Sequence, residues 1–153
     1  MADLSIGVML DSFRLPLNEA LVKAHEVGAQ GIQIYATKGE MAPENLNTAA
    51  RRELLDRIKS NGLKVSALCG DLGMGFGNRE KNPELIERSK RILELARDLE
   101  TDVVTTHIGV VPEYRPSALS DHAGSLRETG GVCRFDAGTL RNRDRPGTCC
   151  TSA

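Results

Sequence analysis

Four side chains suited to chemistry stand at or just after the ends of short apolar runs in this 153-residue sequence. They are Asp11, Tyr35, Asp71 and His107. Short, nearly continuous apolar runs are typical of buried parallel strands. Because the carboxyl ends of parallel strands lie at one edge of their sheet, we expect these side chains to gather at that edge.

His107 is the strongest candidate of the four. A neutral imidazole at such an edge is a common ligand of divalent metals and a common polar contact for substrates. We therefore expect His107 to bind substrate and, as a tentative assignment, a metal ion. The alternative is a histidine that only forms hydrogen bonds with loop backbone.

Asp71 precedes a glycine-rich segment at residues 72–77. Such a segment is typical of a mobile loop over a site. It is not a phosphate-binding P-loop, because no Gly-Lys-Ser/Thr follows. Two interpretations of Asp71 stay open: a substrate-binding residue, directly or through a neighbouring side chain, and a loop residue without ligand contact. The catalytic acid and base are unknown from the sequence.

The apolar runs alternate with segments in which apolar residues recur at helical spacing. Asn82 is expected to cap the last of these helices, with Pro83 at its first position. The order βαβαβαβ predicts an α/β fold with parallel strands, either a doubly wound sheet or a (β/α)8 barrel. The expected strands cover 4–10, 31–35, 64–69 and 102–107, and the expected helices cover about 17–28, 47–60 and 82–99.

Three segments carry a resemblance to a known family. Residues 6–9 followed by AHEVGAQGIQ at 24–33, NGLKVSALCGD at 61–71, and TTHIG at 105–109 follow one another in a characteristic order. Together they resemble the sugar phosphate isomerases and epimerases of the xylose isomerase-like TIM barrel superfamily. The resemblance implies a partial (β/α)8 barrel of about four βα units, because a full barrel takes about 250 residues. Residues 1–116 are then the N-terminal half of the barrel.

The resemblance also implies a chemistry for the intact family. A base removes a proton next to a carbonyl, and a divalent metal (Mn, Mg, Co or Zn) stabilises the enediolate. The two carboxylates that move the proton usually come from the second half of the barrel. We therefore expect this chain to be inactive as written and to bind no metal stably. Gln33 stands where many relatives have Glu, so no carboxylate role is expected there.

Residues 117–153 depart from this pattern. They contain neither Ile nor Lys but five Arg, and glycine, proline and the pair Cys149-Cys150 interrupt any regular pattern. We expect an irregular, disordered tail. Back-translation of residues 141–149 shifted by one base can spell Ala-Ile-Glu-Thr-Gly, which is similar to the strand-five motif of the family. We therefore interpret the tail as out-of-frame translation after a slip near residues 113–118.

Three alternative interpretations of the chain stay open. The chain could instead be an inosose dehydratase-like or apurinic endonuclease-like barrel, or a non-catalytic half-barrel that self-associates through exposed sheet edges.

The nearly balanced charge, 20 Lys and Arg against 21 Asp and Glu, argues against a nucleic acid partner. No apolar run is long enough for a membrane span and no signal peptide is recognised, so a cytoplasmic protein acting on a small sugar or sugar phosphate is expected. Cys69 is expected to be a buried apolar residue.

Overall fold

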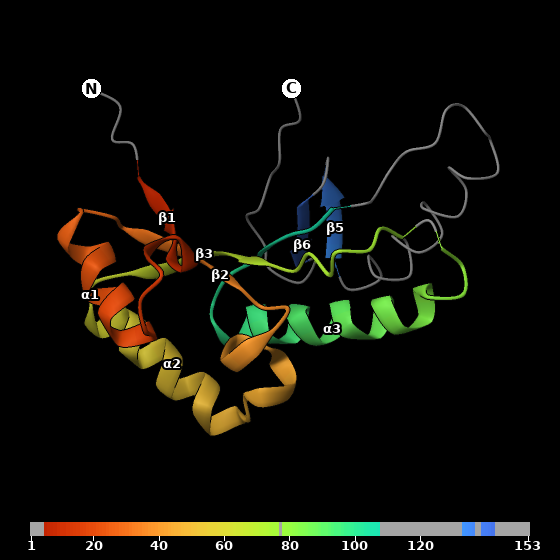
Figure 1. Cartoon of the computed structure of the whole chain (residues 1–153), viewed down its shortest axis with the longest axis horizontal. Helices are drawn as coiled ribbons and strands as arrows, with labels where there is room; N and C mark the ends of the chain where they lie inside the picture. The colour runs from red at the N-terminus through yellow and green to blue at the C-terminus, as the bar shows by residue number, and fades with distance from the viewer. Residues whose placement is uncertain (1–4, 77, 108–132, 137–138, 143–153) are drawn as a thin grey trace.

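The computed structural model describes residues 5–76, 78–107, 133–136 and 139–142 (Figure 1). Strands and helices alternate up to residue 105, as the sequence predicts. In chain order they are β1 (Gly7–Met9), α1 (Leu17–Glu26), β2 (Gly31–Tyr35), α2 (Thr48–Ser60), β3 (Lys64–Cys69), α3 (Asn82–Asp98), β4 (Val103–Thr105), β5 (Cys133–Asp136) and β6 (Thr139–Asn142). Single 3-10 turns cover Leu10–Phe13, Gly39–Met41 and Pro43–Asn45.

All six strands form one sheet in the order β1-β2-β3-β4-β6-β5. The first four pair in parallel, which confirms the predicted α/β arrangement of about four parallel strands. The strand β6 pairs antiparallel with both β4 and β5. Figure 1 shows α1, α2 and α3 on one side of this sheet.

The parallel strands send alternate side chains into the helices. On β2, Ile32 and Ile34 are buried and belong to the hydrophobic core, together with Leu68 of β3 and Val104 of β4. The core also takes Leu21 and Ala24 of α1, Leu54 and Ile58 of α2, and Ile92, Leu95 and Ala96 of α3. Because successive residues of a strand point to opposite faces, the intervening side chains lie on the other face of the sheet.

We name that other face the inner face and define it by Gln33, Tyr35, Ala67, Cys69 and Thr105. The register supports this grouping, since Gln33 pairs with Ala67, Tyr35 with Cys69, and Cys69 with Thr105. Cys69 is a free, buried cysteine, as predicted.

The ends of the helices follow local sequence signals, with one exception. Gly28 ends α1 with a φ of +80°, which favours glycine, and the Asn47 side chain caps α2 by accepting a hydrogen bond from the Ala50 N–H at 2.9 Å. The prediction that Asn82 caps α3 was wrong. Asn82 is the first residue of the helix and is buried, and its side-chain amide donates to the Phe76 carbonyl at 3.0 Å. That amide therefore holds the preceding loop instead of capping the helix.

The expectation for residues 117–153 is corrected in part. The structure places strands at Cys133–Asp136 and Thr139–Asn142, where the sequence predicted none. Phe135 and Thr139 have good strand propensity, and the glycines and prolines that argued against a strand lie outside the two segments. The other residues of this range lie outside the described residues. The described residues test neither the boundary at 116 nor the proposed frame slip.

The segment between β2 and α2 is held in place by Arg51. Its Nε donates to the Leu46 carbonyl at 2.9 Å, and its Nη2 donates to the Pro43 carbonyl at 3.1 Å. Its Nη1 lies 2.7 Å from Asp98 Oδ2 on α3. One guanidinium therefore joins the loop to two helices, and its side chain is only 17% exposed.

Within the described residues, no helix combines the length and apolar character that a bilayer span requires.

Replacing Arg51 with Lys should destabilise the chain by about 1–3 kcal/mol, because a single ammonium cannot serve three acceptors in the fork geometry of a guanidinium. Urea denaturation measures the change. Arg52→Lys at the exposed neighbouring position is the control and should change stability by less than about 0.5 kcal/mol. Equal effects of the two variants would contradict the anchoring role of Arg51.

Replacing Gly70 with Ala should cost about 1–3 kcal/mol through overpacking. A Cβ at this position would lie 2.8 Å from Val104 Cγ1 and 3.4 Å from Ile92 Cγ2. Because Val104→Ala removes the closer atom, the cost of Gly70→Ala should fall below about 0.5 kcal/mol in that background. A double-mutant cycle by chemical denaturation measures this coupling, and an unchanged cost would contradict it.

Candidate functional site

Asp71 and His107 meet just beyond the carboxyl ends of β3 and β4. These strands are neighbours and parallel, so the residues that follow them leave the sheet at the same edge. His107 Nδ1 lies 2.7 Å from Asp71 Oδ2. The His107 side chain is 82% exposed, whereas that of Asp71 is 27% exposed. The structure therefore brings together the two residues that the sequence analysis proposed for substrate binding.

Asp71 is kept ionised by its surroundings. Burial raises the pKa of its carboxyl, but the hydrogen bond from the Gly73 N–H, at 2.9 Å, and the hydrogen bond and charge of His107 outweigh this effect. The pKa of Asp71 therefore lies below its ordinary value. An ionised carboxylate only accepts hydrogen bonds, so the hydrogen of the 2.7 Å contact belongs to His107 Nδ1.

This contact fixes what His107 can do. With Nδ1 carrying the hydrogen, the neutral ring presents Nε2 as a lone-pair donor. That nitrogen can accept a proton, accept a hydrogen bond from a hydroxyl or bind a metal ion. A carboxylate that orients a histidine in this way is typical of histidines that bind metals.

A second polar contact crosses the inner face. Gln33 Nε2 on β2 donates to Thr105 Oγ1 on β4 at 3.0 Å, passing over β3. The Thr105 hydroxyl in turn approaches the Leu68 carbonyl at 3.5 Å. Thr105 lies two residues before His107, and sequence reasoning did not select it. Its position on the same face as Gln33, which the strand alternation predicts, is the signal that could have found it.

Asp11 and Tyr35 do not join the Asp71–His107 pair. They line a different hollow of about 410 Å³ at the carboxyl ends of β1 and β2, together with Lys38 and Glu40. The four sequence candidates therefore divide into two pairs at the same edge of the sheet.

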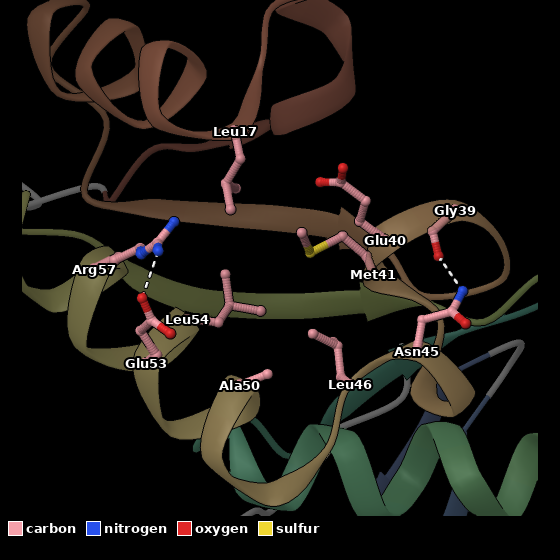
Figure 2. A pocket seen from close by; sticks show the side chains of 10 residues that line it. All are labelled: Leu17, Gly39, Glu40, Met41, Asn45, Leu46, Ala50, Glu53, Leu54 and Arg57. Atoms are coloured by element: carbon pink, nitrogen blue, oxygen red, sulfur yellow. Dashed lines mark hydrogen bonds and ion pairs between the residues drawn. The ribbon is translucent and has the colours of Figure 1, made fainter.

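A groove of about 510 Å³ lies next to this hollow and shares Leu17, Gly39, Glu40 and Met41 with it. Figure 2 shows Leu17 and Leu54 pointing toward each other across the groove, with Met41 beside them. The ion pair between Glu53 and Arg57 and the hydrogen bond from Asn45 to the Gly39 carbonyl lie at its two ends. The groove is formed by α1, α2 and the β2–α2 loop, and its lining contains neither Asp71 nor His107.

The described residues do not by themselves fit a divalent metal. Among them, no group of three or more His, Cys, Asp or Glu side chains is placed to hold an ion. Asp71 and His107 supply two such groups, and Asp71 Oδ2 already accepts from the imidazole. A metal bound at His107 Nε2 would need further ligands from outside the described residues.

Several solved structures share this fold at low sequence identity. A probable 3-DHS dehydratase of Bacillus anthracis, involved in petrobactin synthesis, matches 84% of this chain and 48% of its own length, with 18% identity and a TM-score of 0.65. A sugar phosphate isomerase/epimerase of Parabacteroides distasonis matches 86% of this chain and 48% of its own length, with 12% identity and a TM-score of 0.63.

A family 2 AP endonuclease of Brucella melitensis matches 83% of this chain and 50% of its own length, with 14% identity and a TM-score of 0.63. The chain thus spans about half the length of these structures. No curated protein matches the sequence. The model of the xylose isomerase-like TIM barrel family matches residues 21–134. Four parallel strands with helices on one side agree with this match, and we conclude that the chain belongs to the xylose isomerase-like TIM barrel family.

Proposed function

We propose that this chain supplies the first half of a sugar isomerase or epimerase site, in which His107 contacts a small sugar or sugar phosphate. The observation that supports this is the 2.7 Å contact between His107 Nδ1 and Asp71 Oδ2 at the carboxyl edge of the sheet. Catalytic groups of (β/α)8 enzymes stand at this edge. The contact orients Nε2 as an acceptor for a substrate hydroxyl or as one ligand of a divalent metal.

The charges at this edge favour a sugar over a nucleic acid. The hollow at the ends of β1 and β2 is lined by two carboxylates, those of Asp11 and Glu40, and by one ammonium, that of Lys38. A phosphodiester backbone is held mainly by Lys and Arg, so this balance opposes an endonuclease-like role.

We further propose that the 153-residue chain does not turn over sugar by itself. Its described residues supply one oriented imidazole, whereas proton transfer next to a carbonyl needs a base that takes the proton and a group that stabilises the enediolate. The partner groups would come from the other half of the barrel.

Incubation of the chain with aldoses, ketoses and their phosphates, with Mn²⁺ or Mg²⁺, should give no isomerisation detectable by NMR.

The gene, read one base forward after codon 118, should continue with barrel-like strands. Extending the protein in that frame should restore turnover, and His107→Ala in the extended protein should remove it. Turnover by a monomer of the 153-residue chain, or an early stop codon in that frame, would contradict the proposal.

Manganese tests the orientation of His107 without relying on activity. Mn²⁺ should broaden the ring signals of His107 at lower concentrations than those of His25, an exposed histidine on α1 that serves as an internal control. Asp71→Asn should reduce this difference, because the amide no longer fixes the hydrogen on Nδ1. Equal broadening of the two histidines in the unmodified chain would argue against a prepared ligand.

The lowered pKa of Asp71 predicts a dependence of stability on pH. A carboxyl whose pKa is lower in the folded state stabilises that state above the unfolded pKa, and this contribution is lost as the pH falls through the folded pKa. Below about pH 4, the unmodified chain should therefore lose more stability than Asp71→Asn does. Thermal unfolding across this range measures the difference. Asp56→Asn, at an exposed carboxylate of α2, is the control and should follow the unmodified chain.

A further inference from the structure

We infer that Gln33 is a substrate-binding residue whose side-chain carbonyl accepts a hydrogen bond from one sugar hydroxyl, and that Thr105 is the residue that positions it. This inference rests on the proposed function and specifies how the site recognises its substrate. It assigns to the neutral amide on β2 a role in recognising a hydroxyl, not in moving a proton.

The contacts around Gln33 set the orientation of its amide. Gln33 Nε2 donates to Thr105 Oγ1 at 3.0 Å, and the Thr105 hydroxyl hydrogen is directed to the Leu68 carbonyl at 3.5 Å. With its hydrogen used in this way, Thr105 Oγ1 serves as an acceptor, and the NH2 group of Gln33 must face it. The carbonyl oxygen Oε1 of Gln33 is then left for another donor.

The position of Gln33 gives that oxygen access to a ligand. The side chain is half-buried on the inner face, opposite the core residues Ile32 and Ile34. Its neighbour in register on β3 is Ala67, whose side chain carries no group that could donate a hydrogen bond to Oε1. Among the described residues, no hydrogen bond to Gln33 Oε1 is formed.

The proposed site therefore combines two acceptors of different kinds, one on β2 and one beyond β4, with β3 between them. His107 follows β4, and the Gln33 side chain on β2 is hydrogen-bonded to Thr105, the last residue of β4. A neutral amide carbonyl accepts from a hydroxyl but does not take its proton, whereas a glutamate at this position could do both. This chemistry fits a polyhydroxylated substrate bound by a hydroxyl that does not react.

Binding of D-fructose to the full chain tests the inference, with a set of monodeoxy analogues that each lack one hydroxyl. Dissociation constants come from NMR titration. In the unmodified chain one analogue should bind about five- to tenfold more weakly than D-fructose, the factor expected from one neutral hydrogen bond. In Gln33→Met, which keeps the length of the side chain, D-fructose and that analogue should bind equally. If Gln33 only supported folding, Gln33→Met would weaken the binding of D-fructose and of all the analogues by the same factor.

Thr105→Val provides a second variant in case Gln33→Met does not fold. This variant keeps Gln33 but removes the hydroxyl that its amide contacts. The ratio between the dissociation constants of the weak analogue and D-fructose should therefore fall at least threefold. Thr106→Val is the matched control, because Thr106 Oγ1 contacts the Gly70 carbonyl at 3.5 Å and the same substitution there leaves the Gln33–Thr105 contact intact. This control should retain the preference.

The outcomes separate this inference from the proposed function. If His107→Ala weakens binding of D-fructose but the unmodified chain and Gln33→Met show the same hydroxyl preference, the inference is overturned and the proposed function stands. Absence of any binding of D-fructose by the unmodified chain would overturn both. Loss of the preference in Gln33→Met or Thr105→Val, with the preference retained in Thr106→Val, would support the inference.

Discussion

Burial of one face of the parallel strands against the helices determines where the polar groups of this protein lie. Ile32, Ile34, Leu68 and Val104 are held in a common core with α1, α2 and α3. Once these side chains are fixed, alternation along each strand places Gln33 and Thr105 on the opposite face. A shift of one residue in register would exchange the two sets, at the cost of exposing the apolar side chains to water.

The polar groups at the carboxyl edge depend on the same pairing. Asp71 and His107 follow β3 and β4, and the parallel register of these two strands brings the residues to 2.7 Å. Gly70 directly follows β3 and lies close to the core, since an added Cβ would meet Val104 and Ile92. The packing that holds the sheet to α3 therefore lies directly beside Asp71.

The sequence was a good guide wherever one local pattern dominates. Apolar runs and helical spacing predicted β1 to β4 and the three helices, because buried parallel strands and amphipathic helices have distinct periods. The order of strands also predicted that Asp71 and His107 would share an edge, although their roles stay a prediction. Local patterns gave no indication that Asn82 would hold the Phe76 carbonyl, since this contact depends on where a loop lies in space. Strand alternation could have placed Gln33 and Thr105 on one face, but the contact across β3 depends on the order of the strands in the sheet. The hairpin of β5 and β6 was missed because its strands are short and are surrounded by residues that disfavour strands.

The antiparallel pairing of β6 with β4 limits which further strand can be added to the sheet beside β4. In a (β/α)8 barrel every neighbouring strand runs in the same direction, so the next strand after β4 would be parallel to it. Here Val103, Val104 and Thr105 are already paired with Arg141, Leu140 and Thr139 of a strand that runs in the opposite direction. Parallel and antiparallel ladders place their hydrogen bonds differently, so one strand cannot occupy this edge in both ways. Any separate polypeptide that completes the barrel must first release the hairpin, which makes the hairpin a direct competitor for barrel closure.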